Sequence, residues 1–207
     1  MRPERLVAVL GTGTGVGKTW VSGAVLLRLK AAGVAVAARK PVQSHAPCDV
    51  ETDALVLSFA TGEAPADICP PHRSYSIAMA PPMAAAFLGL PPPALDDLLG
   101  ELDWPAGVEL GLVETVGGPR SPIATDADSA ALAAALQPDL TVLVAPAGLG
   151  ALNAVRLCAA VAPQPLVVFL NRFHNDDLQD RNRRWLQADG YEVIVDLGEL
   201  SRRVAGG

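Results

Sequence analysis

A glycine-rich stretch stands between an apolar run and a helix-like segment near the start of the chain. The apolar run covers residues 6–10, the stretch reads Gly-Thr-Gly-Thr-Gly-Val-Gly-Lys-Thr over residues 11–19, and the helix-like segment covers residues 18–32. Glycines let successive backbone N–H groups turn toward one ligand, and the N-terminus of a following helix favours an anion. This order of strand, turn and helix therefore predicts a phosphate-binding loop.

The residue types in this loop indicate which part of a nucleotide each position meets. We expect the phosphates to be bound by Gly13, Thr14, Gly15, Val16, Gly17 and Lys18, and Mg²⁺ by the hydroxyl of Thr19. Val16 stands where a dinucleotide-binding fingerprint requires glycine, so NAD is not implied. The loop therefore predicts ATP with Mg²⁺.

Apolar runs and helix-like segments alternate along the rest of the chain. The runs are residues 6–10, 34–38, 109–113, 140–145 and 166–170, and the helix-like segments are residues 18–32, 52–60, 128–137, 151–161 and 178–188. Short apolar runs of this kind are typical of buried parallel strands. We expect an α/β fold of the P-loop NTPase type, with a doubly wound, mostly parallel sheet and helices on both faces.

The domain organisation is expected to be simple. Residues 1–207 are interpreted as one P-loop α/β domain, and residues 64–93, which are rich in Pro and Ala, as an excursion over the active-site face. Within this excursion only residues 82–88 are interpreted as a short helix. No internal repeat is evident.

Composition narrows the kinds of partner and the compartment. The net charge of −6 argues against a general affinity for nucleic acid, which needs clustered Lys and Arg, and favours a small-molecule partner. No apolar run approaches the ~18 residues of a membrane span, so no membrane partner is expected. The 3 cysteines are far apart and lack metal-ligand spacing, which favours reduced thiols. The apolar start at residues 6–10 is too short for a signal-peptide core, so a cytoplasmic location is expected.

Three charged residues stand at or near predicted strand ends. Lys40 follows the second strand, Asp53 begins a predicted helix, and Glu114 ends the third strand before a Gly pair. Taken alone, Lys40 is more often a solvated surface charge, and Asp53 a residue that compensates the helix dipole. Because ligands of open α/β sheets bind at the carboxyl ends of the strands, all three are expected in one crevice. Thr19, Asp53 and Glu114 could then bind Mg²⁺ together.

Four motifs in this order resemble the dethiobiotin synthetase family. They are the G-T-x-T-x-V-G-K-T loop, K-P-V-x-S at residues 40–44, T-D-A-L at residues 52–55, and V-E-x-x-G-G at residues 113–118. The resemblance runs from about residue 6 to about residue 171. Five residues between Gly11 and Gly17, one more than the strict phosphate loop has, also resemble the subclass containing partition ATPases and nitrogenase iron proteins.

The resemblance implies a role for each matching position. It implies that Lys18 and Lys40 are catalytic, that Asn171 recognises adenine, and that the amine substrate is bound by Lys40, Ser44, Gly117, Gly118, Gly150 and Asn153. The Gly pair would turn backbone amides toward this substrate. Gly150 and Asn153 would complete the site of the neighbouring subunit in a homodimer. The implied reaction joins 7,8-diaminopelargonate and CO2 into a cyclic urea, through a carbamate and a carbamic-phosphoric anhydride.

The sequence departs from the family's pattern near the expected amine site. The departures are His45, Pro81, Pro82, Met83, Thr115 and Val116, together with a short C-terminal part that lacks the usual Ile-Pro turn framing the base. These changes leave open a related ligase or cyclase that acts on a different amine. A partition-type ATPase switch is a second alternative, but Gly13 occupies the position of the signature lysine of that class. A cobyrinate-type amidotransferase would need an additional glutaminase domain.

Overall fold

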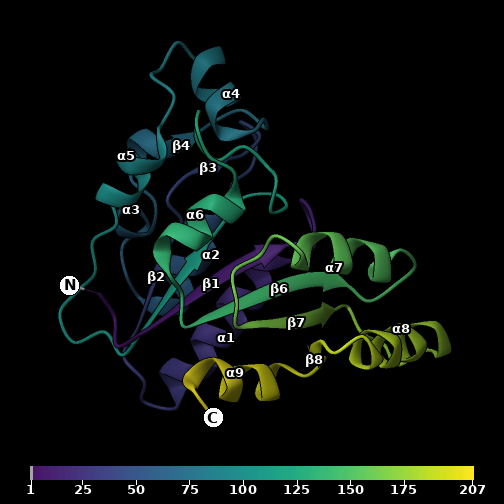
Figure 1. Ribbon diagram of the computed structural model, residues 1–207. Coiled ribbons are helices and arrows are strands. Elements are labelled where there is room, and N and C mark those ends of the chain that lie inside the picture. The colour runs from purple at the N-terminus through teal and green to yellow at the C-terminus, as the bar shows by residue number, and fades with distance from the viewer. Residues whose placement is uncertain (1) are drawn as a thin grey trace.

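A parallel sheet of six strands forms the centre of the computed structural model, which describes residues 2–207 (Figure 1). In spatial order its strands are β2 (Val36–Arg39), β5 (Leu110–Glu114), β1 (Arg5–Gly11), β6 (Leu140–Pro146), β7 (Leu166–Asn171) and β8 (Glu192–Ile194). Each neighbouring pair runs parallel. The chain winds outward from β1 in both directions, which confirms the doubly wound α/β fold.

Helices cover both faces of this sheet. One face packs on α1 (Lys18–Ala31), α2 (Asp53–Thr61) and α9 (Leu197–Ala205), and the other on α6 (Ser129–Leu136), α7 (Ala151–Ala159) and α8 (Asp177–Ala188). Figure 1 shows α7 on the opposite side of the sheet from α1 and α9. Because both faces are covered, the strands are apolar at almost every position. Among residues 2–207, none of the helices combines the length and apolar character that crossing a bilayer requires.

The Pro- and Ala-rich stretch has more regular structure than the sequence indicates. It contains α3 (Pro65–Ile68), a 3-10 turn (Pro71–Arg73), β4 (Ser74–Tyr75) and α4 (Pro81–Phe87), and β4 pairs in parallel with β3 (Gln43–Ser44). The predicted helix over residues 82–88 is present as α4, but the expectation of only one helix is wrong. Both α3 and α4 begin with proline, whose fixed φ suits a first helical turn and whose missing N–H costs nothing there.

A small core of its own holds this stretch against the main domain. It joins residues of the stretch to residues of α5 (Leu95–Gly100), α6 and the segment before α6, and its fully buried members include Tyr75, Ala84, Leu98, Ile123 and Leu132. The stretch is therefore packed in place beside the carboxyl edge of β2 and β5.

The C-terminal elements β8 and α9 are absent from the sequence-based expectations. β8 has only three residues, too few for a recognisable apolar run. α9 begins after Asp196, whose side chain accepts a hydrogen bond from the Glu199 N–H at 2.9 Å and so caps the helix. It packs its buried Leu200 and Val204 into the cluster that also contains α1.

Candidate active site

The turn between β1 and α1 has a backbone that only glycine accommodates. Gly15 and Gly17 have φ angles of 71° and 98°, in the left-handed region that strains residues with a Cβ. At Gly17 a Cβ would also lie 2.2 Å from the Asn171 amide nitrogen. Gly15 and Gly17 are therefore required by the shape of the predicted phosphate loop.

Two residues at the end of β7 contact this turn from the side. Asn171 Nδ2 donates to the Val16 carbonyl at 2.9 Å, and the Arg172 guanidinium donates to the Gly15 carbonyl at 3.0 Å. The Asn171 side chain thus braces the loop, a role beyond the adenine contact that the resemblance implies. Arg172 is absent from the residues predicted from the sequence; its position directly after Asn171 was the available signal.

Lys18 lies buried at the first position of α1, between the loop and the turn that follows β5. Its ammonium group donates to the carbonyl oxygens of Gly13, at 3.2 Å, and Gly117, at 3.0 Å. Burial lowers the pKa of Lys18 to about 8, and the positive charge of nearby Lys40 acts in the same direction. The carboxylates of Glu114 and Asp53 act on this pKa in the opposite direction but are outweighed.

The register of the sheet places Lys40 beside Glu114. β2 and β5 are neighbours, and Arg39 pairs with Val113, so the next residue of each strand lies at the same level. Glu114 also continues the alternation of Leu110 and Leu112, which face α1. Its carboxylate is fully buried, with 0% of the residue exposed, and it points toward the start of α1.

The ammonium of Lys40 joins the two acids predicted from the sequence. Its Nζ lies 2.7 Å from Asp53 Oδ2, 2.8 Å from Glu114 Oε1 and 3.0 Å from the Thr115 carbonyl. Burial would lower the pKa of Lys40, but the carboxylates of Glu114 and Asp53 outweigh it and hold this pKa above its ordinary value. Burial would raise the pKa of Asp53, yet the ammonium of Lys40 holds it below its usual range. Lys40 is therefore a buried, charged group, not a surface lysine.

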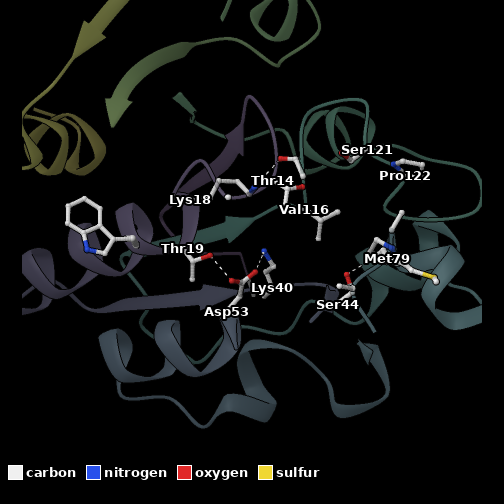
Figure 2. A pocket seen from close by; sticks show the side chains of 17 residues that line it. Thr14, Lys18, Thr19, Lys40, Ser44, Asp53, Met79, Val116, Ser121 and Pro122 are labelled. Carbon is white, nitrogen blue, oxygen red and sulfur yellow. Dashed lines mark hydrogen bonds and ion pairs between the residues drawn. The ribbon is translucent and has the colours of Figure 1, made fainter. Parts of the chain in front are cut away.

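Thr19 and Ser22 complete this network from α1. Thr19 Oγ1 lies 2.8 Å from Asp53 Oδ1 and 2.7 Å from Glu114 Oε1, and Figure 2 shows Thr19 and Lys40 converging on Asp53. Ser22 Oγ donates to Glu114 Oε2 at 2.7 Å. Ser22 is missing from the sequence-based prediction, although it follows Lys18 by one helical turn and so shares its face. Both oxygens of Glu114 are thus hydrogen-bonded.

The donor set formed by Thr19, Asp53 and Glu114 fits Mg²⁺. This ion prefers hard oxygen ligands and commonly takes one or two carboxylates, the remaining positions being filled by water and substrate phosphates. No cluster of three or more His, Cys, Asp or Glu side chains suited to a metal occurs within residues 2–207. A metal here would accordingly depend on ligands supplied by a phosphate substrate.

A cavity of about 560 Å³ opens beside these residues. Its phosphate end is lined by Thr14, Gly15, Gly17, Lys18, Thr19, Lys40 and Asp53. Its other end is lined by Ser44, Ala78, Met79, Ala80, Pro81, Val116, Gly117, Ser121 and Pro122, and Figure 2 shows Ser44, Met79, Val116, Ser121 and Pro122 on that side. Ser44 Oγ donates to the Met79 carbonyl at 2.6 Å. Four of these residues, 78–81, come from the Pro- and Ala-rich stretch, which thus does border the cavity.

Only some of the residues that depart from the family's pattern reach this cavity. Pro81 and Val116 line it. The Thr115 hydroxyl instead donates to the Val9 carbonyl at 3.1 Å inside the sheet, His45 Nδ1 lies 3.1 Å from the Ala46 carbonyl, and Met83 is exposed on α4. The end of the cavity that contains Ser44, where the resemblance implies the amine, therefore differs from the family's pattern at two positions of its wall.

The Gly pair after β5 is hydrogen-bonded within the chain. The Gly117 carbonyl accepts from the Lys18 ammonium, and the Gly118 N–H donates to Ser121 Oγ at 2.9 Å. A substrate could reach the Gly118 amide only by displacing Ser121.

Gly150 and Asn153 stand apart from the cavity. Gly150 precedes α7 with a φ of 90°, and Asn153 is exposed on the first turn of that helix. The neighbouring Leu149 is 92% exposed. Within one chain these residues do not meet Lys40 or Ser44, so any role in the site would require a second copy.

A second cavity of about 630 Å³ adjoins the first. Its lining includes Asn171, Arg172, Phe173 and His174 after β7 and Val195, Asp196 and Leu197 after β8. The C-terminal segment therefore borders this cavity despite lacking the Ile-Pro turn. Gly17 and Trp20 line both cavities.

Comparisons with known proteins identify relatives of this chain. A family model described as an AAA domain matches residues 5–201. The ATP-dependent dethiobiotin synthetase BioD of Xanthomonas campestris pv. campestris is 35% identical over 156 residues, which cover 73% of this chain and 69% of the relative. The protein of the same name from Caulobacter vibrioides is 37% identical over 135 residues, 62% of this chain and 60% of the relative.

The fold is also shared with a distant solved structure. A protein assigned to plasmid partition in Borrelia burgdorferi B31, solved with AMPPNP, superposes with a TM-score of 0.54 at 15% identity, covering 99% of this chain and 89% of that chain. At this identity the likeness shows the P-loop fold alone. The sequence relatives are more specific, and they place the chain in the family of the ATP-dependent dethiobiotin synthetases.

Proposed function

We propose that the protein is a Mg²⁺- and ATP-dependent dethiobiotin synthetase, which closes a cyclic urea from 7,8-diaminopelargonate and CO2. Lys40 is the observation that carries the proposal: the residue is only 1% exposed, and its ammonium bridges two carboxylates at the boundary between the two ends of the cavity. A nucleotide switch needs cations at the phosphates, whereas an anionic carbamate needs one beyond them.

The phosphate end would bind ATP. Residues 13–17 would surround the phosphates with backbone N–H groups, and Lys18 would exchange its bonds to the Gly13 and Gly117 carbonyls for the β- and γ-phosphates. Asn171 would contact the base from its place in the second cavity.

Thr19, Asp53 and Glu114 would hold the metal. Bound Mg²⁺ supplies charge neutralisation on the β- and γ-phosphates and fixes their orientation. Thr19 would then turn a lone pair toward the ion instead of donating its proton to the acids. Ser22 would keep the Glu114 carboxylate in position from its other oxygen.

The reaction would proceed in three steps. One amine attacks CO2, a C–N bond forms, and a proton is released to leave a carbamate. A carbamate oxygen attacks the γ-phosphorus, and the bond from this phosphorus to the β–γ bridging oxygen breaks. ADP departs, and a carbamic-phosphoric anhydride remains. The second amine attacks the carbonyl carbon of the anhydride and loses a proton. The bond between this carbon and the oxygen that carries the phosphoryl group breaks, so phosphate departs as the ring closes.

The chain's contribution to these steps is alignment and charge. Lys40 would offset the negative charge of the carbamate, and Lys18 the charge on the transferring phosphoryl group. Ser44, Gly117 and Gly118 would bind the diamine from one chain, while Gly150 and Asn153 would do so for a second copy in a two-fold homodimer. A cytoplasmic location accords with the free thiols Cys48, Cys69 and Cys158.

A related ligase that acts on a different amine is the second candidate. Pro81 and Val116, which depart from the family's pattern, both line the end of the cavity where the amine would lie. A changed wall alters the shape of the amine that fits without altering phosphate or metal binding.

One assay tests the proposed function directly. Purified protein is given ATP, Mg²⁺, bicarbonate and 7,8-diaminopelargonate, and the product is identified by mass. Dethiobiotin formed together with ADP is the expected result. ADP formed only with another amine would favour the second candidate, a ligase that acts on that amine. The same rate of ATP hydrolysis with every amine, or with none, would overturn both candidates.

A further inference from the structure

Trp20 occupies the boundary between the two cavities. It is the third residue of α1, next to Thr19, and together with Gly17 it lines both the phosphate-side cavity and the cavity that contains Asn171. Its residue surface is 58% exposed. An exposed indole alone is unremarkable, because much of any protein surface is apolar; its position is what distinguishes it.

The other two tryptophans have different surroundings. Trp104 packs under the Arg39 guanidinium, 4.8 Å from ring centroid to Cζ, and belongs to neither cavity. Trp185 on α8 is also 58% exposed and lines neither cavity. The chain therefore offers two equally exposed indoles, of which only Trp20 stands on the route between the loop and Asn171.

We propose that Trp20 is a nucleotide-binding residue whose ring stacks against the ribose and base of the bound nucleoside triphosphate. The inference rests on the proposed use of ATP. A nucleotide whose phosphates lie in the loop and whose base lies near Asn171 must pass Gly17 and Trp20, the residues common to both cavities. Gly17 has no side chain to offer, so the indole supplies the contact surface.

Stacking of this kind gives affinity without selecting a base, because every base has an aromatic face. Trp20 would therefore strengthen the binding of ATP, GTP and CTP alike. Selection among them would depend on hydrogen-bonding groups of the second cavity, Asn171 among them.

The test measures the binding of three ligands, ATP, GTP and inorganic tripolyphosphate, to three variants by calorimetry. Trp20→Ala should weaken ATP and GTP about tenfold each, equivalent to 1.4 kcal/mol, and should leave inorganic tripolyphosphate unchanged, since that ligand reaches only the loop. Trp20→Phe keeps a ring and should retain most of the affinity. Trp185→Ala, the control of equal exposure, should bind every ligand as the parent does. Equal ATP affinity of Trp20→Ala and the parent would overturn the inference.

Fluorescence provides a second readout that needs no loss of affinity. Saturating ATP should change the tryptophan emission of the parent and of Trp185→Phe, and should not change that of Trp20→Phe. Should Trp20→Ala fail to fold, the emission of the parent, Trp20→Phe and Trp185→Phe tests the inference instead. If saturating ATP leaves the emission of the parent unchanged, the stacking contact is rejected. Lys18→Ala should lose tripolyphosphate binding, because this variant removes a phosphate contact of the loop. A failure of the proposed phosphate site is therefore distinguished from a failure of the Trp20 contact.

Discussion

The two ends of the first cavity differ in how their polar groups are engaged. At the phosphate end, Lys40, Asp53, Glu114 and Thr19 form a closed network in which distances between partners are 2.7 to 2.8 Å. At the amine end, Ser44 and Ser121 stand among alanine, proline, methionine and valine side chains. A prebuilt network suits a step common to many enzymes, the transfer of a phosphoryl group, whereas an open apolar wall leaves substrate choice to individual side chains.

The largest effect should come from Lys40, where the two ends meet. Lys40→Ala should lower kcat for dethiobiotin formation by about 10²–10³-fold, the usual cost of losing a group that stabilises transition-state charge. The Kd for ATP should change by less than about threefold, because the contact forms only with the carbamate. Steady-state kinetics and calorimetry measure the two quantities. Lys30→Ala, which removes an ammonium bound to the Thr61 carbonyl at 2.6 Å, serves as the control.

A fall in ATP affinity that matches the fall in kcat would contradict this division. Lys40 would then belong to the phosphate end alone, and the case for a carbamate would weaken.

The second effect concerns the metal. ATP with Mg²⁺ at about a hundred times its Kd should stabilise the parent by about 2.7 kcal/mol, seen as a rise in Tm. In Glu114→Gln this rise should be no greater than that given by ATP with EDTA, because the variant lacks a metal-binding charge. Glu63→Gln removes a different acid, 2.7 Å from Arg39 and away from the cavity, and should lower Tm yet keep the Mg²⁺-dependent rise. A full rise in Glu114→Gln would exclude Glu114 as a metal ligand.

The third effect separates the amine end from the nucleotide side. Val116→Ala should raise KM for the diamine about tenfold, the order expected for lost methyl contacts in an apolar pocket, with the Kd for ATP unchanged. Val195→Ala, in the wall of the second cavity, should raise the Kd for ATP and leave KM for the diamine unchanged. The proposed difference between the two regions is contradicted if both variants weaken the binding of the same ligand.

The smallest effect should come from the turn before α7. If Asn153 binds the substrate of a second copy through a neutral hydrogen bond, Asn153→Ala should raise KM for the diamine about fivefold, matching about 1 kcal/mol. Sedimentation of the parent should give a dimer at working concentration. A fully active monomer would remove Gly150 and Asn153 from the site.

Much of the fold was predictable because parallel strands covered on both faces leave apolar runs that are easy to recognise. β1, β6 and β7 match their predicted runs closely. β8, with three residues, and the two-residue strands β3 and β4 are too short to show any period. The helix α5 follows three consecutive prolines, a composition that favours a loop.

The same contrast holds within the site. Lys18, Lys40, Asp53 and Glu114 could be placed together because Lys40 and Glu114 stand at the carboxyl ends of strands and Lys18 and Asp53 begin helices, and the topology brings these positions to one edge of the sheet. Ser22, Arg172 and Ser121 act through side-chain hydrogen bonds to Glu114, Gly15 and Gly118, and such contacts depend on angles that no spacing in the sequence reveals. The residue roles themselves remain predictions, as does the interpretation of residues 1–207 as one domain.

The pairing of β1 has a consequence for the order of folding. Arg5 pairs with Leu110, and Val7 pairs with Leu140, so each partner of the central strand lies more than 100 residues further along the chain. Contacts of such high order are slow to form, since the loop-closure entropy is lost before they stabilise the chain. A nascent chain emerges at about 5–20 residues per second, so its glycine-rich segment is exposed for several seconds before the strands that fix it have been synthesised.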